Sequence, residues 1–136
     1  MITALDSSVL LDIFGNDPVF QPGSIQALRL CLLEGRLVAC EVVWAEVAGF
    51  FPTIGSTQEA MARAGVEFSP VEAETPLAAG QAWKAYRRRG GRRDRLVADF
   101  LIGAHALLQA DRLLTRDRGF YRTYFSRLPI LDPSRL

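Results

Sequence analysis

Short apolar segments alternate along the chain with longer segments in which apolar residues recur every three or four positions. Short apolar runs are typical of buried strands, and the longer periodic segments are typical of helices with one buried face. Strands are predicted at residues 2–5, 35–41, 66–70, 112–115 and 128–131. Helices are predicted at residues 7–14, 24–34, 42–51, 56–65, 75–91 and 95–110, with a short helical turn after Asp117.

Residues that favour helix ends support these boundaries. Ser56 or Thr57 is expected to cap the fourth predicted helix, and Thr75 followed by Pro76 is expected to begin the fifth. Strands that alternate with helices in this way indicate a parallel sheet with helices on both faces. The sequence therefore predicts a single α/β domain that covers residues 1–136.

Acidic residues follow two of the predicted strands. Asp6 comes directly after the first strand and Asp117 two residues after the fourth, and such sheets bind ligands at the carboxyl ends of their strands. Each of these residues also suits the cap position of the helix that follows it. A third acid, Glu46, lies among apolar residues in the helix after the second strand. A charged side chain in that place needs a partner unless it lies on an exposed stripe.

The predicted helix at residues 95–110 carries a fourth acid, Asp99. Seven apolar residues share one arc of this helix: Leu96, Val97, Phe100, Leu101, Ala104, Leu107 and Leu108. Asp99 lies about 60° outside that arc, on a flank with Gly103, Ala106 and Ala110. These small residues either leave space beside the carboxylate or allow another helix to pack closely, and an exposed surface aspartate is the remaining alternative.

Four carboxylates at one edge of a sheet repel one another, and something must offset that repulsion. Two such groups about 4 Å apart repel by about 4 kcal/mol at an effective dielectric constant of about 20. Raised pKa values or a bound cation can offset this energy. Ligands that are all oxygen favour Mg²⁺ or Mn²⁺, which activate water and stabilise charge on a phosphodiester. The hydroxyls of Ser7, Ser8 and Thr115 can each bond a carboxylate or a water of such a site, although helix capping is the favoured role of Ser7.

Charge is distributed unevenly along the chain. Residues 1–80 contain three arginines and ten acids, a net charge of −7. Residues 81–136 contain twelve arginines, one lysine and five acids, a net charge of +8. The basic C-terminal part suits a polyanionic partner, and it also suits an acidic site that must attract an anionic substrate.

Several other classes of protein and site are not expected. Cys31 and Cys40 are too few for a disulfide scaffold and lack zinc-site spacing, so both are expected to be buried, reduced thiols. His105, the only histidine, is expected on the polar side of its helix, which argues against a Ser–His–Asp or Cys–His mechanism. No apolar run reaches about 18 residues and no leader segment precedes the first strand, so a cytoplasmic protein without a membrane span is expected.

The order of these motifs resembles that of the PIN domain family, and within it the VapC-type toxins of toxin–antitoxin pairs. The resemblance covers nearly the whole chain and rests on "LDSSVLLDIF", "EVVWAEVAGFF", "VADFLIGAHALLQADRLLTRDRGF" and a final apolar strand. It implies a three-layer α/β/α sandwich with a short-stranded, mostly parallel central sheet. It also implies a divalent-metal-dependent endoribonuclease.

The resemblance assigns roles to residues of this chain. Carried over residue by residue, the acidic set of the family falls on Asp6, Glu46, Asp99 and Asp117. Asp6 and Asp99 would be the firmest ligands of Mg²⁺ or Mn²⁺, and the other two acids would complete the site directly or through water. Ser8 and Thr115 would support it. The chain departs from the family pattern in having two serines after the first acid and "FLIGAHAL" after the third, but neither departure removes an acid.

The resemblance also implies three partners, which are an RNA substrate, a VapB-like antitoxin and a second copy of the chain in a homodimer. Candidate RNA-binding residues are Arg87, Arg88, Arg89, Arg92 and Arg93 in the basic segment 87–95, and Arg116 and Arg118 beside Asp117. The antitoxin or solvent are alternative partners for these arginines.

Two other functions remain open at this stage. Phospho-acceptor receiver domains also place aspartates at the ends of parallel strands. Their chemistry needs a lysine at a further strand end, whereas the only lysine, Lys84, lies within a predicted helix. A non-catalytic module would use the acids only as helix caps and would bind RNA or protein through its basic half.

Overall fold

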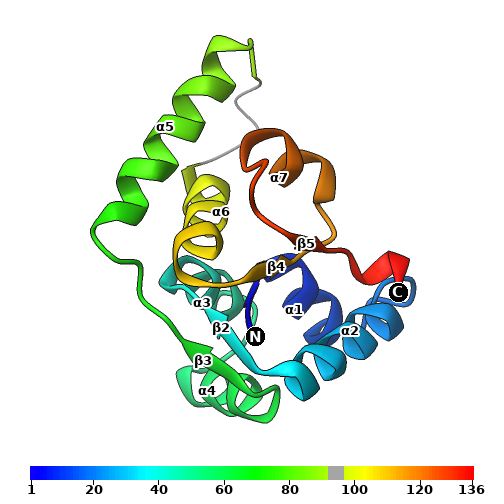
Figure 1. Cartoon of the computed structure of the whole chain (residues 1–136). Coiled ribbons are helices and arrows are strands. Elements are labelled where there is room, and N and C mark those ends of the chain that lie inside the picture. Colours follow the sequence, from blue (N-terminus) through cyan, green and yellow to red (C-terminus); the bar gives the residue numbers. More distant parts are fainter. Residues whose placement is uncertain (92–96) are drawn as a thin grey trace.

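Five short strands form one sheet at the centre of the molecule (Figure 1). The structure is a computed structural model that describes residues 1–91 and 97–136. The strands are β1 (Ile2–Leu5), β2 (Arg36–Ala39), β3 (Val66–Phe68), β4 (Arg112–Leu114) and β5 (Ile130–Leu131), in the spatial order β3-β2-β1-β4-β5. Neighbouring strands of this sheet pair in parallel, which confirms the predicted α/β fold.

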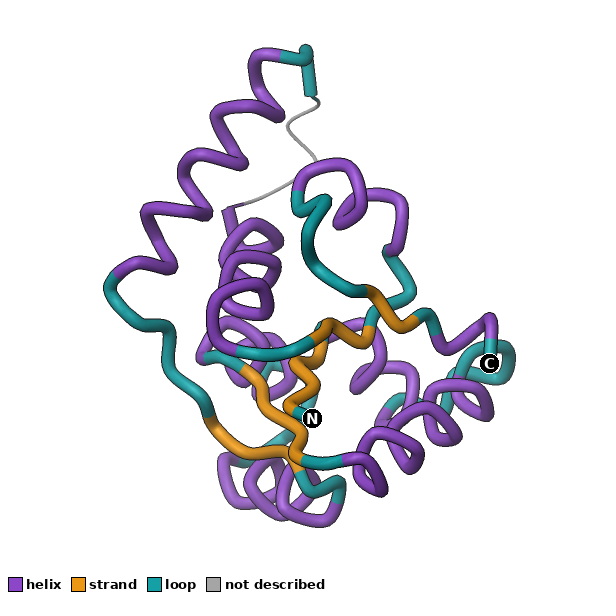
Figure 2. Tube along the Cα trace, in the orientation of Figure 1, coloured by secondary structure: helices purple, strands orange, loops and turns teal. Residues whose placement is uncertain are grey.

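Helices surround the sheet (Figure 2). They are α1 (Ser7–Phe14), α2 (Gln21–Glu34), α3 (Glu41–Ala48), α4 (Ile54–Arg63), α5 (Glu74–Arg88), α6 (Val97–Gln109) and α7 (Arg118–Tyr124), followed by the 3₁₀ turn η1 (Pro133–Arg135). Because crossovers between parallel strands are right-handed, α1 to α4 cover one face and α5 to α7 the other. The packing agrees, since α1 contacts α2 and α3, while α5 contacts α6 and α7. This is the expected three-layer sandwich.

Two helices begin earlier than their cap residues predicted. The N-cap of α4 is Thr53, whose hydroxyl accepts a hydrogen bond from the Ser56 amide at 3.0 Å in a capping box. Ser56 therefore lies inside the first turn and supports the cap. Helix α5 begins at Glu74, and Thr75 is fully buried with its hydroxyl donating to Gln109 Oε1 at 2.8 Å. Thr75 thus joins α5 to α6 and does not cap its own helix.

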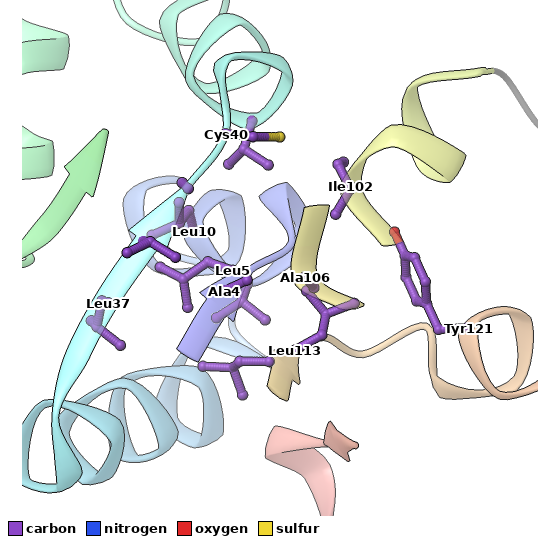
Figure 3. Close-up of a cluster of buried hydrophobic side chains, with 14 of the residues drawn as sticks. Ala4, Leu5, Leu10, Leu37, Cys40, Ile102, Ala106, Leu113 and Tyr121 are labelled. Carbon is purple, nitrogen blue, oxygen red and sulfur yellow. The ribbon is translucent and has the colours of Figure 1, made fainter. Parts of the chain in front are cut away.

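The core lies on both faces of the central strands. Leu5, Leu37 and Leu113 come from β1, β2 and β4, and Figure 3 shows them in one cluster of buried side chains. Cys31 and Cys40 are free and buried, and burial raises the pKa of both thiols. The expectation of small, reduced core cysteines is confirmed. None of the described helices is both long and apolar enough to cross a bilayer.

His105 is not on a polar surface of α6, as the sequence had indicated. Only 1% of it is exposed, and its Nε2 lies 3.0 Å from Ser69 Oγ. The chain between β3 and α5 covers this side of the helix, because Gln109 bonds the carbonyl of Pro70 and the amide of Glu72. The pattern of apolar residues indicated one buried face of α6 and missed a second one, which includes His105.

The stability of the protein is expected to depend on pH through His105. Burial holds the pKa of His105 below its ordinary value of 6.5, against the smaller opposing influence of Glu41 and Glu72. Below that pH the unfolded chain binds a proton that the folded chain does not. The free energy of unfolding therefore does not change through His105 above pH 6.5. It decreases as the pH falls from 6.5 toward the lowered pKa, by at most about 1.4 kcal/mol per pH unit.

Urea denaturation of the parent and of His105→Gln between about pH 8 and about pH 5 measures this contribution. The free energy of unfolding of the parent is expected to fall more steeply with acidification than that of the variant. Parallel curves would contradict the assignment of a neutral, buried His105.

Candidate active site

Asp6 lies where β1 ends and α1 begins. Its amide donates to the carbonyl of Leu114 at 3.1 Å, so β1 and β4 remain paired up to this residue. Its carboxylate Oδ2 accepts hydrogen bonds from Thr115 Oγ1 at 2.7 Å and from Ser8 Oγ at 3.3 Å. Asp6 occupies the N-cap position of α1, but its side chain makes no capping hydrogen bond. The cap interpretation of Asp6 was therefore wrong, and the carboxylate faces the end of β4.

Asp117 repeats this arrangement at the next strand. It occupies the N-cap position of α7 without a capping hydrogen bond from its side chain. Its amide donates to Thr115 Oγ1 at 3.0 Å. The hydroxyl of Thr115 therefore bridges the backbone of Asp117 and the carboxylate of Asp6. The parallel register of β1 and β4 brings the two acids to one edge of the sheet.

Glu46 reaches the same edge from α3. Its side chain is accessible to solvent, and its Oε1 accepts a hydrogen bond from Ser7 Oγ at 3.1 Å. Partial desolvation raises the pKa of Glu46, Ser7 opposes that shift, and the charges of Asp6 and Asp99 add to it. Ser7 therefore contacts a candidate site residue, whereas the sequence had favoured a role in capping α1. The one signal for this contact was the place of Ser7 between Asp6 and Ser8.

Asp99 approaches from the other face of the sheet, in the first turn of α6. Helices α3 and α6 are in contact, which brings Asp99 and Glu46 into one electrostatic environment. The small residues beside Asp99 serve close packing, because a Cβ on Gly103 would lie 2.4 Å from the Phe125 ring. At Gly103 the close contact is with the residue that follows α7, and not with another helix.

Burial and like charge together raise the pKa of Asp6. Burial is the largest cause, the charges of Asp99 and Asp117 add to it, and the hydrogen bonds from Thr115 and Ser8 oppose it. The four predicted acids therefore interact at one edge of the fold. Among residues 1–91 and 97–136, however, no three acidic, histidine or cysteine side chains are arranged as a ready set of metal ligands. The donor chemistry fits a hard cation, and ligation requires some of these side chains to rotate toward it.

The sequence pattern of the whole domain identifies its family. The PIN domain profile matches residues 3–126. The chain belongs to the PIN domain family. The receiver-type alternative loses its support, because this PIN domain places its only lysine within α5. No curated protein matches the sequence of this chain significantly.

Solved structures share the fold over almost the entire PIN domain. VapBC2 from Rickettsia felis, bound to a DNA fragment from its promoter, has a TM-score of 0.75 at 18% identity, with 97% of this chain and 98% of that chain covered. VapBC-1 from nontypeable Haemophilus influenzae has a TM-score of 0.75 at 22% identity and coverages of 99% and 100%. A toxin–antitoxin complex from Klebsiella pneumoniae has a TM-score of 0.69 at 19% identity and coverages of 96% and 97%.

The candidate RNA-binding arginines of the PIN domain differ in their surroundings. Arg87, Arg88 and Arg89 are exposed at the end of α5, with Arg87 5.0 Å from the Trp83 ring centroid. Arg92 and Arg93 lie outside the described residues. Arg118 begins α7, whereas Arg116 is engaged by the carboxylate of Asp12. Tyr86 on α5 is buried and packs against the rings of Phe100 and Tyr124.

Proposed function

We propose that this PIN domain is a metal-dependent endoribonuclease and the toxin of a toxin–antitoxin pair. The observation that carries the proposal is the buried carboxylate of Asp6, which caps no helix and interacts electrostatically with Asp99, Asp117 and Glu46. Burying a carboxylate next to other carboxylates destabilises a fold. A site that holds a divalent cation for phosphodiester hydrolysis gives this arrangement a function.

Asp6 and Asp99 would hold Mg²⁺ or Mn²⁺, with Glu46 and Asp117 completing the site directly or through water. Thr115 and Ser8 both donate to Oδ2 of Asp6 and would hold this carboxylate in place beside the ion. When bound, the ion activates a water molecule and stabilises charge on the phosphodiester oxygens.

The chain itself supplies a candidate proton acceptor. Glu46 is accessible, and Ser7 engages its Oε1. Its pKa is raised mainly by desolvation, which makes the carboxylate a stronger base. The second oxygen, Oε2, is therefore suited to accept the proton of an attacking water.

Cleavage of structured RNA in Mg²⁺ or Mn²⁺ tests the proposal, with Asp6→Asn and Asp99→Asn as the informative variants. Asp111→Asn is the matched control, because Asp111 bonds the Ile2 amide at 2.6 Å at the opposite end of β1. We expect cleavage by the parent and the control, no cleavage in a chelator, and severe loss in both site variants. If both variants cut RNA as fast as the parent, the domain is instead a binding module whose acids have no catalytic role.

An apolar groove supports the proposal of an antitoxin partner. The groove has a volume of about 520 Å³ and lies between α1, α2 and α4. Apolar side chains make up most of its lining (Ile13, Phe14, Ile25, Leu28, Phe51, Ala60 and Ala64), together with Arg29, Ser56, Glu59 and Arg63. Apolar surface of this kind on a folded domain is typical of a protein interface. The similar structures include a toxin–antitoxin complex, so we assign the groove to an apolar segment of the cognate antitoxin.

Ala60→Arg is expected to weaken binding of the cognate antitoxin by about 10-fold or more, because it places a charge in the apolar groove. RNA cleavage is expected to persist, since α4 carries none of the four acids. Gln58→Arg introduces the same side chain at an exposed position of the same helix. It is expected to change neither the affinity for the antitoxin nor RNA cleavage. Calorimetry measures the affinities. Equal affinities of the two variants would show that the antitoxin docks elsewhere.

The exposed arginines of α5 and Arg118 are the candidates of the described chain for contacts with RNA phosphates. We include Arg92 and Arg93 among the arginines proposed to contact RNA. We also propose that the protein is a homodimer in the cytoplasm. Light scattering of the purified protein tests whether it is a dimer.

A further inference from the structure

An ion pair joins α1 to the loop between β4 and α7. Asp12 of α1 is only 4% exposed, and Arg116 binds it through two hydrogen bonds, Nε to Oδ2 at 2.6 Å and Nη2 to Oδ1 at 3.0 Å. Ser24 of α2 donates to the same Oδ2 at 3.2 Å. The Arg116 guanidinium also lies over the Phe20 ring, with its Cζ 3.9 Å from the centroid. Both partners are therefore held in a single orientation.

This pair connects the two chain segments that carry much of the candidate site. Arg116 stands between Thr115 and Asp117, and Asp12 lies on the helix that begins directly after Asp6. Side chains join the segments at two points, by the hydroxyl of Thr115 on Asp6 and by the guanidinium of Arg116 on Asp12, and the Asp6 amide adds a backbone hydrogen bond to Leu114. Of these contacts, the Arg116 pair lies furthest along the loop, between Thr115 and Asp117.

Stability alone is a weak reason for such a pair. A buried ion pair often contributes no more stability than apolar residues of similar volume, and in some proteins its role is to specify one arrangement of the chain. The planar guanidinium suits that purpose, because it binds a carboxylate through two parallel hydrogen bonds that a lysine cannot reproduce.

We propose that Asp12 and Arg116 are positioning residues that hold the β4–α7 loop so that Thr115 and Asp117 remain beside Asp6. The inference rests on the proposed nuclease function. Arg116 acts here through the protein, and contact with RNA is not its role. Asp12, with both oxygens bound to Arg116, is the acid of α1 that stays outside the catalytic set.

Two measurements on Asp12→Asn, Arg116→Gln and Arg116→Lys test the proposal. In steady-state cleavage of RNA, we expect kcat to fall about 10-fold or more with KM nearly unchanged, and Arg116→Lys to recover part of the loss. In hydrogen exchange followed by NMR, the Asp117 amide, which is bonded to Thr115 Oγ1, is expected to exchange about 10-fold faster in Asp12→Asn and Arg116→Gln.

Glu67→Gln is the matched control, because it breaks another two-oxygen arginine–carboxylate pair, Arg36–Glu67, between β2 and β3. It is expected to leave kcat and the exchange of Asp117 unchanged. The double variant Asp12→Asn/Arg116→Gln is expected to lose no more activity than the worse single variant, since the two residues act as one unit.

A rise in KM without loss of kcat would overturn the proposal, because it would indicate that Arg116 binds substrate. Unchanged exchange of the Asp117 amide would also overturn it. The exchange measurement does not depend on catalysis, so it distinguishes failure of this inference from failure of the proposed function. If the parent does not cleave RNA at all, the proposed function fails instead.

Discussion

Asp6→Asn is expected to lower kcat for RNA cleavage by about 100-fold or more, because a bound metal supplies several kcal/mol of transition-state stabilisation. The same variant is expected to be more stable than the parent at neutral pH. Burial raises the pKa of Asp6 above its ordinary value of 3.8, so this carboxyl group destabilises the folded chain at neutral pH relative to a neutral side chain. Asparagine removes that charge and still offers Thr115 an acceptor oxygen.

The stability difference between the parent and Asp6→Asn is expected to vary with pH. Between pH 3.8 and the raised pKa, the folded parent binds a proton that the unfolded chain has released. The stability of the parent therefore decreases as pH rises through the raised pKa, and the advantage of Asp6→Asn appears over that range. Urea denaturation in a chelator at several pH values measures it.

Asp111→Asn provides the comparison for cleavage, since its carboxylate is at the far end of the strand. It is expected to leave cleavage unchanged. Loss of cleavage in Asp6→Asn together with a less stable fold would mean that the aspartate is structural, contrary to our assignment.

Gly103→Leu is expected to lower the free energy of unfolding by about 2–3 kcal/mol, through overpacking that exceeds the gain in helix propensity. A Cβ at this position would lie 2.4 Å from Cε2 and 2.7 Å from Cδ2 of Phe125. The Phe125 ring is only 4% exposed and packs on Phe100 and Tyr121, which restrict its movement. Because Asp99 lies one helical turn before Gly103, RNA cleavage is expected to decline as well.

Gly80→Leu makes the same substitution on α5, at an exposed position where a Cβ would meet no atom within 4 Å. It is expected to raise the free energy of unfolding by about 0.5–1 kcal/mol, because glycine is a poor helix former. Thermal and urea denaturation of the two variants measure the difference. Equal effects would show that α6 and the segment after α7 are not closely packed.

The positions of strands and helices followed from local patterns. A strand such as β1 is short and apolar because both faces of the sheet are covered, and α6 repeats its apolar residues because one side packs on the sheet. The acids after β1 and β4 were predicted to converge because carboxyl ends of parallel strands share an edge. Their electrostatic interaction is consistent with that prediction.

Features that depend on contacts between distant segments were missed. Ser7 and Glu46 are 39 residues apart in the chain, and Asp12 and Arg116 are 104 apart. His105 was placed on the wrong kind of surface, because the segment that covers it belongs to another part of the chain. The pairing of Arg116 with Asp12 was missed for the same reason, since the neighbours of Arg116 in sequence include no sign of Asp12.

Residue type and spacing thus decide which parts of this chain become strands, which become helices and which edge of the sheet collects carboxylates, because these depend on interactions within a few residues. Folding alone decides which serine meets Glu46, which acid is neutralised by an arginine and whether an N-cap aspartate bonds its helix or the next strand. Those outcomes depend on distances between segments far apart in the chain, and no local pattern encodes such distances.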